Sequence, residues 1–183
     1  MTLENFLGKG LQQEPTNAEE IYRFLAKVAT KLADAQSRHV SLDSRFDLAY
    51  EALLQIGLIA LRANDLRPDS RGGHHQLALQ TLNATIAYPR EKLRLLDEFR
   101  RKRSVGLYDG SFEASQAEVE SLIAAVVELK AHLEDWLRSK HRVLLEQQPW
   151  APSPSPTSAR PTNNTPPAGR GWWNRCCGPI HCA

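Results

Sequence analysis

The spacing of apolar residues predicts a chain built from helices. From about residue 17 to residue 145, apolar side chains recur every three or four positions, which is the spacing of one face of an α-helix. Helices are expected at about 17–37, 41–64, 74–87, 89–107 and 115–137, the last with a continuation towards Leu145. No segment has the alternating pattern of a convincing strand. The predicted fold class is therefore an all-α antiparallel bundle of about five helices with short connections.

Local signals mark the ends of these helices. Asn17-Ala-Glu-Glu20 and Ser115-Gln-Ala-Glu118 have the form of capping boxes. In a capping box, the first and fourth residues each accept a hydrogen bond on their side chain from the backbone N–H of the other. Ser41 is the expected cap of the second helix, and Pro89 suits a first helical turn. Gly110 is a natural stop after the fourth helix.

The second predicted helix is apolar around most of its circumference, which places it in the middle of the bundle. Gly57 interrupts it. Because glycine costs about 1 kcal/mol relative to alanine inside a helix, we expect a neighbouring helix to approach closely there.

Composition divides the chain into three parts: a lead-in at 1–16, the bundle at 17–146 and a tail at 147–183. Eight of the eleven prolines lie in the tail, among Ser, Thr, Asn and Gly. Such a segment buries too little apolar surface to offset its ordering entropy, so a disordered tail is predicted. All three cysteines, Cys176, Cys177 and Cys182, also lie there, without the C-x-x-C spacing of zinc sites. We expect no bound metal and no disulfide framework.

Overall charge excludes few functions. The formal net charge is +2 for 183 residues, so the chain is not a general nucleic-acid binder by charge. Met1 to Gln13 lacks the pattern of a secretory signal, and no run of about 18 apolar residues occurs. The expectation is a cytoplasmic protein with no membrane contact and no cofactor.

The most informative stretch is a basic run, Arg100, Arg101, Lys102 and Arg103, near the end of the fourth helix. Arg100 and Arg103 fall on the same helical face as Leu93 and Leu96, so two arginines continue an apolar stripe. A buried, unpaired guanidinium costs several kcal/mol, and this face should therefore meet a carboxylate, a phosphate or water. The simpler interpretation is a charged helix end that complements the C-terminal dipole.

Other candidate chemistry is sparse. Gly72-Gly73 precedes His74 and His75 at the start of the third helix. The glycine pair is compatible with anion binding at a helix N-terminus, and more simply with a turn. Adjacent histidines point about 100° apart on a helix, so they would not chelate one ion together. Capping or packing against the bundle is the simpler role for either.

Three segments together resemble a known superfamily. They are Ser44 to Ala52 (SRFDLAYEA), the Gly-His-His that opens the third helix, and Arg103-Ser104-x-x-x-Tyr108. With the helix layout, they resemble HEPN-domain proteins, the higher-eukaryote and prokaryote nucleotide-binding superfamily, over about Ala18 to Leu145. The likeness is greatest to small stand-alone bacterial members found with toxin–antitoxin and other defence genes.

The resemblance implies specific expectations. Many HEPN proteins are dimeric, metal-independent ribonucleases in which an Arg–polar–x3–His motif from each subunit meets in a shared cleft. Arg103 matches the arginine, Ser104 the polar residue, and Tyr108 stands where the family has histidine. An imidazole titrates near neutrality, whereas a phenol near pKa ~10 is mainly a proton donor at pH 7. The site thus retains anion binding, with Arg100, Arg101 and Lys102 in support, more clearly than it retains cleavage.

Three functions follow as alternatives. The first is a nucleotide- or RNA-binding partner or regulator in a two-gene module, whose expected companion by family analogy is a minimal nucleotidyltransferase. The second is a ribonuclease that uses Arg103 and Tyr108, with His74 or His75 in support. The third is a ligand-free structural dimerisation bundle in which Arg103 only pairs with an acidic residue such as Asp47 or Asp109. A homodimer is expected from family behaviour.

Overall fold

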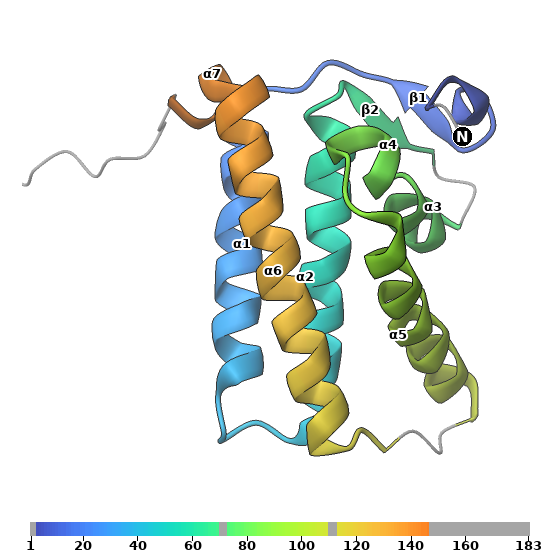
Figure 1. Ribbon diagram of the computed structural model, residues 1–183, viewed down its shortest axis with the longest axis vertical. Helices are drawn as coiled ribbons and strands as arrows, with labels where there is room; N and C mark the ends of the chain where they lie inside the picture. Colours follow the sequence, from blue (N-terminus) through green and yellow to red (C-terminus); the bar gives the residue numbers. More distant parts are fainter. Residues whose placement is uncertain (1–2, 70–72, 110–112, 147–183) are drawn as a thin grey trace, which may run out of the picture. The chain divides into compact units, whose positions relative to one another are not determined.

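The protein is mostly helical, as the apolar pattern predicts. A computed structural model describes residues 3–69, 73–109 and 113–146. Three long helices, α1 (Ala18–Gln36), α2 (Leu42–Arg62) and α6 (Gln116–Lys140), lie side by side (Figure 1). Helix α5 (Arg90–Asp109) lies on the other side of α2 and contacts it. In these ranges, no helix is both long and apolar enough to cross a membrane.

Helix α2 is the centre of the core. Twelve of its 21 residues are buried, and it contacts every other long helix. The prediction that this helix lies in the middle is confirmed. The rings of Phe46 and Phe99 meet edge to face at 6.1 Å and connect α2 to α5. The large buried surface of α2 therefore sets the position of each helix packed on it.

The close approach predicted at Gly57 is also confirmed. A Cβ atom built at Gly57 would lie 3.0 Å from Cβ of Ala78 and 3.1 Å from its backbone oxygen. Ala78 belongs to the short helix α3 (His74–Gln80). The missing side chain thus lets α3 pack directly on the backbone of α2.

The predicted third helix is broken into two. Helix α3 ends at Gln80 and α4 (Leu82–Ile86) begins after Thr81. The Thr81 hydroxyl donates to the carbonyl of Leu77, and the Thr85 hydroxyl donates to that of Thr81. Such back-bonding by threonine competes with the helical ladder and bends the chain. The expected long continuation of the last helix is also interrupted, because His141 leaves helical geometry before α7 (Arg142–Glu146).

The expectation of no strand is wrong for the lead-in. Strands β1 (Leu11–Gln13) and β2 (Leu66–Pro68) pair antiparallel. A short 3-10 helix, η1 (Leu3–Phe6), precedes β1. Three-residue strands are too short for an alternation pattern to be recognised. The lead-in is thus packed onto the bundle, where Leu11 joins a second small apolar cluster with Leu61, Leu66 and Ala78.

The predicted helix starts are confirmed, with one difference. Ser41 caps α2, and Ser115 and Glu118 form the full capping box of α6. Asn17 accepts from the backbone N–H of Glu20 at 2.8 Å, which is half of the predicted box. The Glu20 carboxylate does not close the other half, because it binds arginines from α2 and β2.

Candidate functional site

A groove opens where α2, α3 and α5 meet, with a volume of about 310 Å³. Leu54, Leu58 and Ala78 supply its apolar lining. The polar lining comes from Glu51 and Gln55 of α2, from His75 of α3 and from Arg103 of α5.

Arg103 is held against α2 at this groove. Its Nε–H donates to Oδ1 of Asp47 at 3.0 Å, and its guanidinium carbon lies 4.9 Å from the ring centroid of Tyr50. The side chain is 18% exposed, in agreement with the predicted position on the inner face of the helix. Among the described residues, this is its one hydrogen bond. The terminal Nη groups therefore keep donors that a ligand can use.

Tyr50 joins Arg103 to α3. Its ring is almost fully buried and meets the His75 ring edge to face, with 6.2 Å between centroids. Burial raises the pKa of the Tyr50 phenol, and the charges of Arg103 and Arg100 offset part of that rise. The phenol is therefore neutral at physiological pH, and the ring acts as a platform for the guanidinium.

The other three cations of the basic run have acidic partners. Arg100 and Arg101 both donate to Asp97, at 2.7 and 2.8 Å. Burial alone would raise the pKa of Asp97, but the two arginines outweigh that effect and lower it. Lys102 pairs with Glu118. The hydrogen bond from Lys102, with those from Ser115, lowers the pKa of Glu118 to about 2.

The remaining predicted site residues are not brought together by described contacts. Ser104 lies exposed on α5, away from the groove lining. Tyr108 lies in the last turn of α5 and His74 in the first turn of α3, and the side chains of both fall outside the described part. Gly73 precedes His74 at a φ of 75°, a left-handed conformation that favours glycine.

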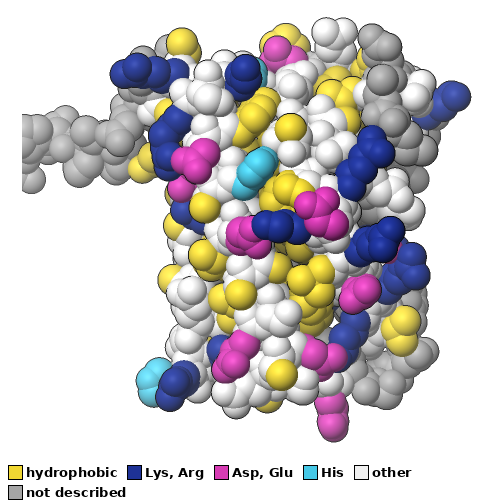
Figure 2. Space-filling view, viewed as in Figure 1, with side chains coloured by type: hydrophobic (Ala, Val, Ile, Leu, Met, Phe, Trp, Pro, Cys, Tyr) yellow, Lys and Arg dark blue, Asp and Glu magenta, His cyan; other side chains and the backbone are white. Residues whose placement is uncertain are grey.

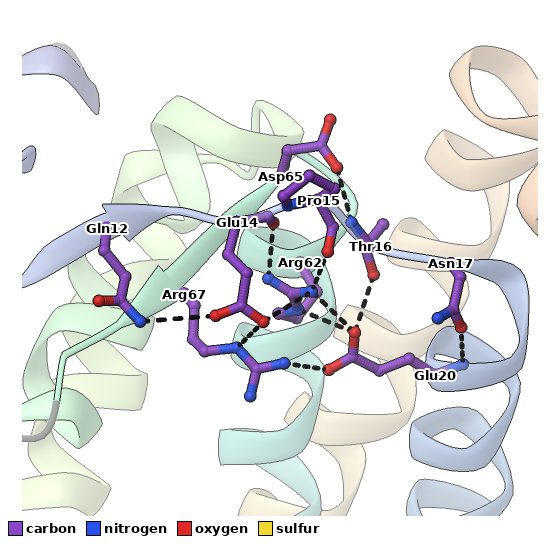
Figure 3. Close-up of polar contacts among 9 residues, drawn as sticks. All are labelled: Gln12, Glu14, Pro15, Thr16, Asn17, Glu20, Arg62, Asp65 and Arg67. Atoms are coloured by element: carbon purple, nitrogen blue, oxygen red, sulfur yellow. Dashed lines mark hydrogen bonds and ion pairs between the residues drawn. The ribbon is translucent and has the colours of Figure 1, made fainter.

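A second arginine site lies at the far end of α2 (Figure 3). Arg62 is 3% exposed and donates four hydrogen bonds: two to Glu20 Oε2, one to the carbonyl of Glu14 and one to that of Pro15. Arg67 of β2 donates to the other oxygen of Glu20 at 2.8 Å. Burial would raise the pKa of Glu20, but the hydrogen bond and charge of Arg62, with help from Thr16 and Arg67, lower it.

The residues around Arg103 are partly ones that sequence reasoning missed. Tyr50 and Asp47 lie three positions apart in the SRFDLAYEA segment, so one helix face carries both. The sequence named Asp47 only as one of two possible acidic partners for Arg103 in the ligand-free alternative. The spacing is the signal that links them to one site. Nothing in the sequence marks Arg62 as buried, since its partners come from the lead-in.

Acidic and basic side chains are interspersed on the face shown in Figure 2. Within 3–69, 73–109 and 113–146, no group of three or more His, Cys, Asp or Glu side chains is arranged to hold a metal ion.

Comparison with models of protein families, with curated proteins and with solved structures finds no match to this chain.

Proposed function

We propose that this protein is a HEPN-like nucleotide- or RNA-binding protein whose phosphate contact is Arg103 in the groove between α2, α3 and α5. One observation carries the proposal. Tyr50, His75 and Arg103 come from the three separate segments on which the HEPN resemblance rests, and Arg103 and His75 both contact the Tyr50 ring. The site residues thus cluster in space although 25 and 28 positions separate them along the chain.

The chemistry of Arg103 supports phosphate binding. A guanidinium presents five N–H donors in a planar fork, and the hydrogen bond to Asp47 uses one of them. Partial burial at 18% exposure reduces screening by solvent. Contact with the Tyr50 ring orients the guanidinium plane of Arg103, so this side chain loses little conformational entropy when it binds a phosphate.

The proposal concerns binding rather than cleavage. Ribonuclease activity would require Tyr108 to move a proton in place of the family's histidine, and a phenol with an ordinary pKa of ~10 is a poor base at pH 7. Pairing with a nucleotidyltransferase in a two-gene module and formation of a homodimer stay predictions from the resemblance.

The test is a binding titration with the full chain. Fluorescence anisotropy of a labelled single-stranded RNA decamer is measured for wild type and for Arg103→Ala, and the experiment is repeated across a range of salt concentrations. Loss of a charge-assisted hydrogen bond predicts affinity weakened about tenfold or more. It also predicts a salt slope reduced by about 0.7, the value for one contact to a single strand.

The matched control is Arg138→Ala. It removes an arginine that is 60% exposed on α6 and pairs with Asp135, so it changes net charge equally without touching the groove. RNA binding that weakens equally in both variants would contradict the proposed site. Absence of RNA and nucleotide binding in wild type would contradict the function.

A ligand-free structural bundle is the second candidate, because one observation favours it. Arg100, Arg101, Lys102 and Arg103 each pair with a carboxylate of the same chain. This candidate predicts that Arg103→Ala lowers stability and changes no binding. The same titration, combined with an unfolding curve, separates the two.

A further inference from the structure

The groove next to Arg103 has hydrogen-bond acceptors along one wall. Glu51 and Gln55 are one turn apart on α2, so their side chains lie on the same helix face. Oε2 of Glu51 binds Lys31, and no described group donates to its Oε1. The amide oxygen of Gln55 is shielded from solvent and has no donor among the described residues.

An acceptor in that state is unfavourable in the free protein. A buried oxygen without a hydrogen-bond donor destabilises the protein by about 1–3 kcal/mol, and a ligand N–H that donates to it would recover this free energy. Gln55 lines the groove, so its side-chain amide lies next to the space that a ligand would occupy. The groove wall therefore favours a ligand edge that carries N–H donors.

The other surfaces of the groove favour a flat apolar body and an anionic group. Leu54 and Leu58 of α2 and Ala78 of α3 supply the apolar lining. Arg103 supplies donors for the anion. A volume of about 310 Å³ is at the lower end of the range for small-molecule sites, roughly 300–1,000 Å³, and suits one nucleotide unit.

We propose that the groove selects guanine nucleotides, with the guanine edge on Glu51 and Gln55 and the phosphate on Arg103. Guanine carries two adjacent donors, N1–H and the N2 amino group, which match the two oxygens of a carboxylate. In this arrangement Oε2 of Glu51 accepts from both the base and Lys31. Uracil places carbonyl oxygens on both sides of its single N–H and is repelled by Glu51. Adenine and cytosine offer one amino group beside a ring-nitrogen acceptor. This inference rests on the proposed function and specifies the base that the same site takes.

The test measures binding of GMP, AMP, CMP, UMP and inorganic phosphate to the full chain by calorimetry. GMP is expected to bind about tenfold or more tightly than UMP, in line with the discrimination of a bidentate base contact. Glu51→Gln should remove most of that preference and leave affinity for inorganic phosphate unchanged. Arg103→Ala should weaken all five.

The control for Glu51→Gln is Lys31→Met, which removes the partner of Glu51 and keeps the carboxylate. It should retain the GMP preference. Equal binding of all four nucleotides, or a GMP preference that survives Glu51→Gln, would overturn the base assignment while leaving phosphate binding at Arg103 intact. No binding of any nucleotide would overturn both proposals.

Discussion

The two arginine sites of this protein differ in how fully their donors are used. Arg62 is 3% exposed and donates four hydrogen bonds, two of them to backbone carbonyls of the lead-in. Arg103 is 18% exposed, donates one to Asp47 and lies at a groove. Arg62 is almost fully buried and uses four of its five N–H donors within the chain, so it serves to join segments of the chain. Arg103, which has more spare donors, is the candidate for recognition.

The two sites also differ in what holds them. Glu20, the main partner of Arg62, is 15% exposed, whereas Asp47, the partner of Arg103, is 49% exposed. Removing one partner of a buried ion pair costs several kcal/mol, because the other charge is left without water or a partner. Removing one partner of a solvent-exposed pair costs little, because water solvates the remaining charge. Substitution of Arg62 should therefore lower the free energy of unfolding strongly, and substitution of Arg103 should lower it slightly.

The largest effect is expected from Arg62→Met. The change removes two of the hydrogen bonds to the Glu20 carboxylate and the donor to each of two backbone carbonyls, and breaking a buried pair costs about 3–5 kcal/mol. Urea unfolding followed by circular dichroism measures the change in the free energy of unfolding. Arg138→Ala serves as the surface control and should cost about 0–1 kcal/mol. A loss of stability in Arg62→Met no larger than that in Arg138→Ala would show that Arg62 contributes no more than a surface arginine.

Gly57→Ala should cost about 1–3 kcal/mol through overpacking. The added Cβ would lie 3.0 Å from that of Ala78, so α3 must shift away from α2 and take His75 with it. Alanine favours the helix over glycine by about 1 kcal/mol, so Gly57→Ala would stabilise the protein if the added Cβ met no obstacle. A stabilised variant would show that α3 does not rest on this glycine.

Acid should weaken the Arg62 site. Pairing lowers the pKa of Glu20 in the folded protein, so its stabilisation is complete above the ordinary value of 4.5 and is lost as the pH falls through the lowered folded value. Glu118, with a folded pKa of about 2, adds a loss in the same direction. Unfolding free energies measured from pH 6 to pH 2 should decline, and Glu20→Gln should flatten the decline. An unchanged pH dependence in Glu20→Gln would argue against this coupling.

Apart from the surface control, the smallest effect of a substitution on stability is expected from Arg103→Ala, about 1 kcal/mol. It removes one ion pair with a half-exposed carboxylate and one contact with the Tyr50 ring, each worth about 1 kcal/mol or less. Thermal unfolding measures it alongside Arg62→Met. A loss as large as that of Arg62→Met would assign Arg103 to the core and favour the structural candidate.

The sequence was sufficient for features that depend on local pattern. The helix starts at Ser41 and Ser115, the central place of α2 and the close approach at Gly57 follow from caps, periodicity and glycine cost. The inward position of Arg103 follows from its spacing on α5.

Features that depend on distant segments could not be predicted in the same way. The β1–β2 pairing and the burial of Arg62 arise from contacts across more than 40 residues, and no local pattern records them. Asp47 and Tyr50 lay within the recognised SRFDLAYEA segment, but their role needed the packing of α5 on α2. The break at Thr81 is a competition between side-chain and backbone hydrogen bonds, which apolar spacing does not reveal.

The most direct test of the central claim, that Arg103 is held ready for an anion, is the nucleotide affinity of Asp47→Asn at low salt. Asparagine keeps an oxygen for the Nε–H of Arg103 and removes the competing negative charge. The account predicts GMP bound several-fold more tightly than by wild type. Affinity that is unchanged or weaker in Asp47→Asn would contradict it.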